Sequence, residues 1–208
     1  MKLKKLIPEL VNNIIDLGYD KEPREVEGLA MSVIKSGADA LIRSGEGTGK
    51  STALVMGAIQ RLKNPVEEAP RAIIVVSSRE KAFEMEELFK KLSFRTNLRV
   101  FPAFDQGILQ YQKDMIYEGL DLLIVTPKRL MELISCTGIP MTKIQTIFVD
   151  DFDKMDKATE VPVLYHLENM LEKVQHIVTY TNWHESLDIF EERVMKGPRM
   201  IEVEEPID

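Results

Sequence analysis

The sequence predicts an α/β domain in which a mostly parallel β-sheet is flanked by helices on both faces. Short runs rich in valine and isoleucine recur along the 208 residues, separated by amphipathic segments long enough for helices. This alternation is typical of right-handed βαβ crossovers around a buried parallel sheet. A second observation agrees with it: residues 44–51 read Ser-Gly-Glu-Gly-Thr-Gly-Lys-Ser directly after one of these runs. A glycine-rich turn between a strand and a helix is typical of phosphate-binding loops in such sheets.

Two helices are predicted before the first strand. The segment Leu3–Leu17 carries apolar residues on one helical face and stops at Gly18. A second helix is expected over Pro23–Ser36, and Gly37 ends it. Both helices precede the glycine-rich segment, so we expect them to pack on the core that follows.

Seven strands are predicted, with helical segments between most of them. One helix is expected over Ser78–Leu92, with Ser77 and Glu80 as its capping box, and another opens with Pro127 at its first position. In parallel sheets ligands bind at the carboxyl ends of the strands, so motifs that follow strands are expected to meet at one edge. The predicted strands are Ala38–Arg43, Ala72–Ser77, Arg99–Pro102, Leu122–Thr126, Thr146–Val149, Ile177–Thr181 and Met200–Val203.

Composition limits the cellular setting and the partners. Cys136 is the single cysteine, which excludes a disulfide within the chain and favours a reducing compartment. No apolar run is long enough to span a membrane, and no signal peptide is recognisable, so we expect a cytoplasmic protein without membrane association. The net charge of −7 opposes a general affinity for nucleic acid, although a local basic patch can still bind phosphates.

The glycine-rich loop has a specific phosphate chemistry. Its glycines let consecutive N–H groups point at phosphate oxygens, Lys50 would reach the β- and γ-phosphates, and Ser51 would bind Mg²⁺. A purely structural turn explains less, because three glycines cost conformational entropy and a lysine at a helix N-terminus is unfavourable without an anion. One departure is Ser44, which stands where such loops usually begin with Gly or Ala. The predicted contacts are Ser44, Gly45, Gly47, Thr48, Gly49, Lys50, Ser51 and Thr52.

Three carboxylates, Asp150, Asp151 and Asp153, follow the strand Thr146–Val149. Side chains of like charge repel each other at a strand end unless a cation holds them. We expect Asp150 to hold Mg²⁺ through water and Asp151 to orient or deprotonate an attacking water. Helix N-capping explains the cluster equally well on its own, but the phosphate loop upstream favours the metal.

The order of these motifs resembles the first RecA-like domain of DEAD-box RNA helicases, over about residues 3–203. This resemblance implies a RecA-like P-loop NTPase domain. Each short motif is weak alone, whereas six in the right order are specific. Residues 44–51 match the nucleotide loop, 77–82 resemble Pro-Thr-Arg-Glu-Leu-Ala, 126–130 resemble Thr-Pro-Gly-Arg-Leu, 150–153 occupy the Asp-Glu-Ala-Asp box, 179–181 resemble Ser-Ala-Thr, and 18–19 with 23–27 lie where the adenine is read.

The resemblance implies ATP and Mg²⁺ as cofactors and RNA or another nucleic acid as partner. It assigns a role to each matching position. Catalysis would fall to Lys50, Asp150 and Asp151, the metal to Ser51 and Asp150, the base to Tyr19 and Glu27, nucleic-acid contacts to Arg79, Thr126, Lys128 and Arg129, and coupling to Asp153 with Thr179 or Thr181.

Several positions depart from the family pattern. Glu27 replaces a glutamine, and an ionised carboxylate only accepts hydrogen bonds, so adenine binding should weaken; the alternative is a solvated helix residue. Asp151 replaces a glutamate and is shorter by about 1.5 Å, a displacement that slows catalysis. Near the nucleic-acid motifs, Asp105-Gln106 replaces a glycine pair and Lys128 replaces a glycine, adding one repulsive and one attractive charge.

The predicted organisation has three parts. Residues 1–37 form helices that pack on the core and carry the degenerate adenine-reading segment, residues 38–203 form the RecA-like core, and residues 204–208 form a tail or linker. The family's second RecA-like domain, with its arginine finger, has no counterpart in this sequence. We therefore expect either a truncated helicase or a short relative, with a second domain acting in cis or in trans.

Three functions are compatible with these observations. The first is an ATP- and Mg²⁺-binding domain of a DEAD-box-like RNA helicase, an enzyme that couples nucleotide state to nucleic-acid binding and hydrolyses ATP weakly in isolation. The second is a degenerate helicase-like module without catalysis, acting through a protein or RNA partner. The third is a P-loop NTPase outside the helicases.

Overall fold

Seven parallel strands form one sheet in the order β3-β4-β2-β5-β6-β1-β7. The computed structural model describes residues 5–21, 24–66, 69–171 and 173–203, and the predicted tail at 204–208 lies outside them. The strands are β1 (Ala40–Ser44), β2 (Ala72–Val75), β3 (Val100–Ala103), β4 (Leu122–Val125), β5 (Thr146–Val149), β6 (Gln175–Tyr180) and β7 (Arg199–Val203).

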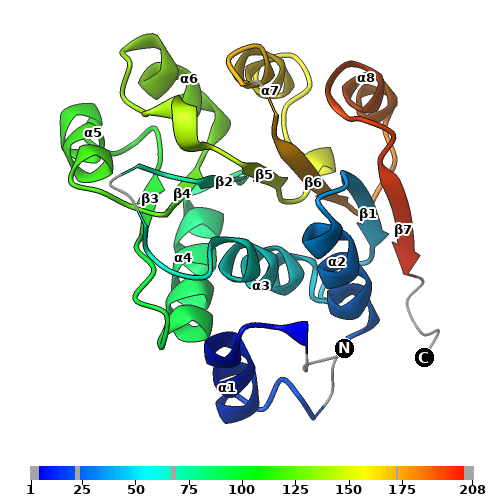
Figure 1. Ribbon diagram of the computed structural model, residues 1–208. Helices are drawn as coiled ribbons and strands as arrows, with labels where there is room; N and C mark the ends of the chain where they lie inside the picture. Colours follow the sequence, from blue (N-terminus) through cyan, green and yellow to red (C-terminus); the bar gives the residue numbers. More distant parts are fainter. Residues whose placement is uncertain (1–4, 22–23, 67–68, 172, 204–208) are drawn as a thin grey trace.

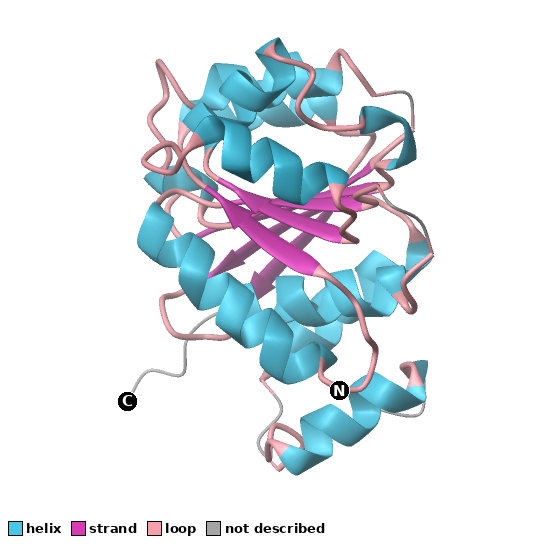
Figure 2. Cartoon of the chain, turned by 90° about the vertical axis from the view of Figure 1, so that its left-hand side faces the viewer, coloured by secondary structure: helices cyan, strands magenta, loops and turns pink. Residues whose placement is uncertain are grey.

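The predicted α/β class is confirmed by helices that cover both faces of this sheet. Figure 1 shows α2, α3 and α4 on one face and α5 to α8 on the other, with α1 outside α4. Figure 2 shows the sheet between the two helical layers. The helices are α1 (Pro8–Asp16), α2 (Glu25–Ser36), α3 (Lys50–Leu62), α4 (Arg79–Ser93), α5 (Leu109–Tyr117), α6 (Pro127–Ser135), α7 (Val161–Glu168) and α8 (Glu185–Val194), with short 3-10 turns η2 (Met141–Lys143) and η3 (Phe152–Lys154).

The central strands β2, β4 and β5 are largely apolar because both of their faces are buried. In β1, Ala40 and Ile42 belong to the core beneath α2 and α3, whereas Leu41 belongs to the core on the opposite face. Successive side chains of a strand point to opposite faces, so a sheet covered twice requires apolar residues at every position. Among the described residues, no helix is long and apolar enough to cross a bilayer.

Three helix starts differ from the prediction. Helix α1 begins at Pro8 rather than Leu3, because proline has no N–H to donate inside a helix and is favoured in its first turn. Helix α2 begins at Glu25, two residues after Pro23. The expected cap of α4 is wrong by one residue: the hydroxyl of Ser78, not Ser77, accepts the backbone N–H of Lys81.

A buried histidine joins three elements at the amino edge of the sheet, opposite the phosphate loop. His176 in β6 lies 2.8 Å from Glu168 at the end of α7, and its ring faces Asp39 just before β1 at 3.9 Å. Burial by itself lowers the pKa of His176, but Asp39 and Glu168 outweigh it, and the pKa lies above its ordinary value. The imidazolium form therefore stabilises the fold.

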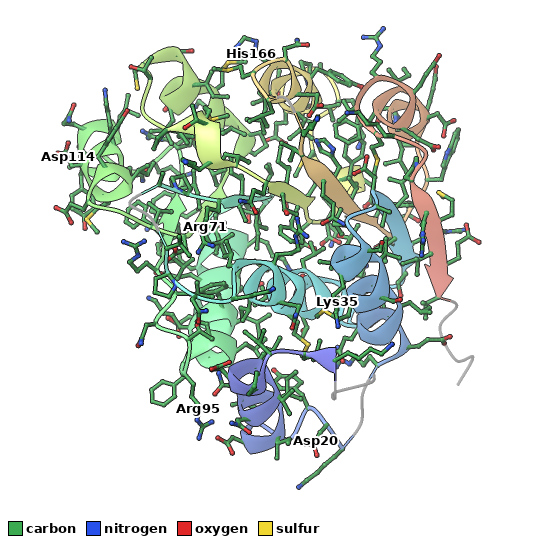
Figure 3. All side chains as sticks on the ribbon, in the orientation of Figure 1. Asp20, Lys35, Arg71, Arg95, Asp114 and His166 are labelled. Atoms are coloured by element: carbon green, nitrogen blue, oxygen red, sulfur yellow. The ribbon has the colours of Figure 1, made fainter. Side chains whose placement is uncertain are left out.

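This cluster predicts a pH-dependent stability. A raised folded-state pKa means that the contribution of His176 is fully present below its unfolded pKa, about 6.5, and is lost as pH rises through the folded value. The difference in free energy of unfolding between wild type and His176→Gln should therefore shrink as pH rises from about 6.5 through the raised folded-state pKa. Urea denaturation at several pH values measures it, with the exposed His166→Gln (labelled in Figure 3) as control. A difference that grows with pH would contradict the assignment.

Candidate nucleotide-binding site

The glycine-rich loop turns from β1 into α3 as predicted. Gly47 and Gly49 have φ of 75° and 99°, the left-handed region that side chains rarely adopt. A Cβ on Gly49 would also lie 2.8 Å from the Arg24 side chain, so only glycine fits. Ser44 has a role inside the loop: its hydroxyl donates to Thr48 Oγ1 at 2.8 Å, and Thr48 donates on to the Gly45 carbonyl at 2.8 Å.

Lys50, the first residue of α3, is buried and held by oxygen atoms. Its Nζ donates to the carbonyls of Ser44 at 2.7 Å and Gly45 at 2.6 Å, and to Thr181 Oγ1 at 2.8 Å. Asp151 Oδ1 lies 3.7 Å away. The ammonium is therefore fixed between the loop, the end of β6 and the acidic cluster.

The predicted metal pair is assembled. Ser51 Oγ donates to Asp150 Oδ2 at 2.8 Å, and Thr179 Oγ1 donates to Asp150 Oδ1 at 3.0 Å. Burial raises the pKa of Asp150; the Lys81 ammonium, 3.5 Å from Oδ2, opposes this effect and the neighbouring Asp151 adds to it. Hydroxyl and carboxylate oxygens are the ligands that Mg²⁺ prefers.

Within the part of the chain that the structure describes, no group of three or more His, Cys, Asp or Glu side chains is arranged to hold a metal ion. Mg²⁺ commonly keeps several waters and binds through one or two protein ligands together with substrate phosphates. The Ser51 and Asp150 pair fits this two-ligand mode of Mg²⁺ binding and does not form a site enclosed by protein ligands.

Asp151 faces the loop from the end of β5. Its backbone lies in the left-handed region, with φ 51° and ψ 57°, a conformation that aspartate tolerates and that is enriched at functional sites. Lys154 lies 3.2 Å from Asp151 Oδ2 and 3.0 Å from Glu46 in the phosphate loop. The hydrogen bond to Glu46 raises the pKa of Lys154. This lysine thus bridges the loop and the acidic cluster.

Asp153 makes the predicted connection to the motif at residues 179–181. Its carboxylate accepts the backbone N–H of Thr181 at 3.1 Å and of Asn182 at 3.0 Å. Burial by itself raises the pKa of Asp153, but these donors outweigh it and lower the pKa below its ordinary value. Thr179 makes the parallel link, since its hydroxyl also accepts the Asp151 N–H at 3.0 Å. Thr179 in β6 and Thr181 directly after it thereby hold Asp151 and Asp153.

Glu27 is buried beside the loop, so its alternative interpretation as a solvated helix residue is wrong. Its side chain is 2% exposed, Oε2 accepts the Arg24 N–H at 3.3 Å, and Oε1 faces Gly49. Burial raises the pKa of Glu27, and Arg24 opposes that effect. Tyr19 is half-buried and packs against the core beneath α2 to α4; it does not line the phosphate pocket.

The phosphate pocket has a volume of about 300 Å³. Sequence reasoning missed Arg24, Glu46, Lys81 and Lys154 in its lining. Lys81 had a signal, because it occupies the leucine position of the motif at residues 77–82. Arg24 and Glu46 lie within the segments 23–27 and 44–51 that the resemblance assigned to nucleotide binding, whereas Lys154 became recognisable only once the elements were packed. The pocket is lined by Arg24, Gly45, Glu46, Gly47, Gly49, Lys50, Ser51, Thr52, Lys81, Asp151 and Lys154.

The predicted nucleic-acid residues lie along the neighbouring strand ends. The Arg79 guanidinium lies over the rings of Phe83 at 5.6 Å and Phe104 at 5.0 Å. Lys128 is 3.6 Å from Asp105, so the added attractive and repulsive charges offset each other. Thr126 Oγ1 lies 3.5 Å from the same carboxylate.

Arg129 does not offer its side chain to a ligand. It is 2% exposed, and its Nη2 donates to the carbonyls of Asp105 at 2.9 Å and Gly107 at 2.8 Å. The predicted direct phosphate contact is corrected: Arg129 holds the loop after β3, because its position early in α6 directs the side chain beneath that loop.

Together the strand order and the loop define a RecA-like P-loop nucleotide-binding domain. The loop follows β1, the acids follow β5, and β6 between them supplies Thr179 in the strand and Thr181 directly after it. A family model described as DEAD/DEAH box helicase matches residues 24–182, and the chain belongs to this family. The resemblance seen in the sequence is thereby confirmed.

Known proteins support the same assignment. DEAD-box ATP-dependent RNA helicase 52A of Oryza sativa subsp. japonica is 26% identical over 181 residues, covering 79% of this chain and 30% of that protein. ATP-dependent RNA helicase me31b of Drosophila melanogaster is 25% identical over 173 residues, covering 83% and 37%. The chain therefore spans well under half the length of these curated relatives.

A solved structure confirms the fold. S. cerevisiae Dbp5, in a complex with Nup159, Gle1, IP6 and ADP, superposes with a TM-score of 0.85 and 18% sequence identity. The match covers 95% of this chain and 52% of the Dbp5 chain.

Proposed function

We propose that this chain is the ATP- and Mg²⁺-binding RecA-like domain of a DEAD-box ATP-dependent RNA helicase, with weak ATPase activity in isolation. The observation that carries the proposal is the convergence of Lys50, Asp150 and Thr181 at the carboxyl ends of the adjacent strands β1, β5 and β6. Family membership and the ATP-dependent relatives support it. A P-loop NTPase outside the helicases is excluded by the family match.

The phosphates would be bound by the loop N–H groups, the N-terminus of α3 and Lys50. Ser51 and Asp150 would hold Mg²⁺, which, when bound, would supply positive charge that neutralises the charge developing on the phosphates. Asp151 Oδ1 is buried and accepts no hydrogen bond from the described residues, so it is available to orient a water. Its short side chain and its contacts with Lys50 and Lys154 favour slow turnover.

Coupling to RNA would run through β6. Thr179 is hydrogen-bonded to Asp150 and Asp151, and Thr181 is hydrogen-bonded to Lys50 and Asp153. A shift of the groups that contact the nucleotide would therefore move this edge of the sheet. Arg79, Thr126 and Lys128 lie at the same carboxyl edge, where they would contact the nucleic-acid backbone. A second RecA-like domain, in cis or in trans, would supply the missing arginine. The cytoplasm remains the proposed compartment.

Turnover separates this proposal from a binding module without catalysis. We expect slow ATP hydrolysis that Asp151→Ala abolishes while ADP binding is retained, because the carboxylate acts on water and not on the diphosphate. Phosphate release assays with and without single-stranded RNA measure it, and the exposed Asp114→Ala is the control. Equal phosphate release by wild type and Asp151→Ala would contradict the catalytic role.

Glu27→Gln should strengthen adenine nucleotide binding. An amide both donates and accepts, whereas an ionised carboxylate leaves an adenine acceptor facing a negative charge, so we expect about tenfold tighter ADP binding at pH 8. The raised pKa predicts a smaller gain at lower pH, where the neutral carboxyl can donate. Calorimetric titration with ADP and GDP tests this, with the exposed Glu25→Gln on the same helix as control. Weaker ADP binding by Glu27→Gln would contradict it.

A further inference from the structure

Lys81 places a fixed positive charge beside the metal-binding pair. It lies in the first turn of α4, its Nζ is 3.5 Å from Asp150 Oδ2, and the same oxygen accepts the hydroxyl of Ser51. The side chain is 25% exposed and lines the phosphate pocket. The corresponding motif of the family has leucine at this position, which carries no charge.

The other cations of the pocket are bound to different partners. Arg24 donates to the Gly47 carbonyl at 2.6 Å, and Lys154 bridges Glu46 and Asp151. Lys50 is held by the loop and Thr181. Among the cations that line the pocket, Lys81 is therefore the one that contacts Asp150, the carboxylate expected to bind Mg²⁺. Its second acidic neighbour, Glu84, is 3.8 Å away and largely exposed.

Two cations at one buried carboxylate repel each other strongly, because the interior screens charge poorly. An ammonium at Asp150 both weakens the attraction of that carboxylate for a divalent ion and offers its own charge to phosphate oxygens bound at Ser51. The charge that Mg²⁺ normally contributes to phosphate binding is then already present in the protein.

We propose that Lys81 makes nucleotide binding by this domain largely independent of Mg²⁺, by neutralising the phosphates from the position next to Asp150. This inference rests on the proposed nucleotide-binding function. It concerns nucleotide binding and not hydrolysis. The Lys81 ammonium has three N–H donors and a compact positive charge, so it can bind phosphate oxygens.

The test is the affinity for ADP measured by calorimetry in excess Mg²⁺ and in excess EDTA. For wild type we expect the two dissociation constants to agree within about threefold. Lys81→Met keeps an unbranched side chain, one atom shorter, and removes the charge, so its affinity in EDTA should fall by about tenfold or more, while the affinity in Mg²⁺ is maintained or improved. Lys81→Arg should resemble wild type.

The matched control is Lys90→Met on the same helix, since Lys90 pairs with Glu86 and lies outside the pocket. Melting temperatures of all variants verify folding. A wild-type affinity that collapses in EDTA as much as that of Lys81→Met would overturn the inference while leaving the proposed function intact. Absence of ADP binding in both buffers would instead overturn the proposed function, and the inference with it.

Discussion

Lys50→Ala is expected to reduce the affinity for ADP and ATP by about 100-fold or more, the range seen when one partner of a buried charged contact is truncated. The ammonium is 6% exposed and has no equivalent within the loop. Its removal takes away the charge nearest the expected phosphates. The substitution also removes the hydrogen bonds that Lys50 donates to the Ser44 and Gly45 carbonyls, so these oxygens would face the bound phosphates without a donor.

The same substitution removes the link between the loop and β6. Lys50 donates to Thr181, and Thr181 donates its N–H to Asp153, so the loop and the acidic cluster share one hydrogen-bonded path. A nucleotide that engages Lys50 would redirect the ammonium from these oxygens to its phosphates. We therefore expect Lys50→Ala to abolish any effect of nucleotide on RNA affinity in addition to weakening nucleotide binding.

Calorimetric titration with ADP, paired with RNA binding measured with and without ADP, checks both parts of this prediction. Lys35→Ala is the matched control, because it removes the same charge. Lys35 is exposed near the C-terminal end of α2 (Figure 3). Retention of ADP affinity within about threefold in Lys50→Ala would contradict the assignment of the phosphate site.

Asp121→Ala should cost about 3–5 kcal/mol of the free energy of unfolding, because it leaves buried arginine charge without its partner. The Asp121 carboxylate is fully buried just before β4. It accepts from Arg71, just before β2, at 2.8 Å, and from the side chain and backbone N–H of Arg99, just before β3, each at 3.0 Å. One carboxylate therefore ties together the amino ends of three strands.

The ionised form of Asp121 is the stabilising one. Burial by itself raises its pKa, but the hydrogen bonds from Arg99 and Arg71 outweigh burial and hold the pKa below its ordinary value. Its contribution should be present above the unfolded pKa of about 3.9 and be lost as pH falls through the folded value. At neutral pH, the loss in Asp121→Ala corresponds to a fall of about 6–20 °C in melting temperature for a domain of this size.

Thermal unfolding by circular dichroism measures this change. Asp114→Ala, an exposed aspartate on α5 labelled with Arg71 in Figure 3, is the control and should shift the free energy of unfolding by no more than about 0.5 kcal/mol. A loss in Asp121→Ala below about 1 kcal/mol would show that hydrated arginines replace the ion pairs at little cost.

Much of the fold was predictable from the sequence, because its determinants are local. Strands buried on both faces are mostly apolar, and this left recognisable runs at the central strands β2, β4 and β5, while the partly exposed edge strand β7 kept a shorter apolar pattern. The wrong predictions concern helix starts. The start of α1 at Pro8 was missed, and Ser77 was predicted as the cap of α4 where the adjacent Ser78 is the cap. Such boundaries depend on single hydrogen bonds that sequence patterns do not resolve.

The candidate site was predictable where a motif fixes both backbone and chemistry. The phosphate loop, Ser51 with Asp150, and Asp153 with Thr181 lie together as expected. Arg129 was misplaced, because a cation in a motif gives no sign of whether it faces solvent or supports a loop. Glu27 was left between two interpretations for the same reason, and its burial against Gly49 decided the matter.

By itself the sequence determined that this is a parallel α/β domain with a phosphate loop and an acidic strand end, since those features arise from neighbouring residues. Only the tertiary structure decided what lies across the pocket. Inserting β6 between β1 and β5 brings Thr179 and Thr181 to both motifs. Packing of α2 and α4 on the same core brings Arg24 and Lys81, from two motif segments far apart in the sequence, to one phosphate pocket. Charges at a site act through distance, and distances between remote segments are set only when the chain packs.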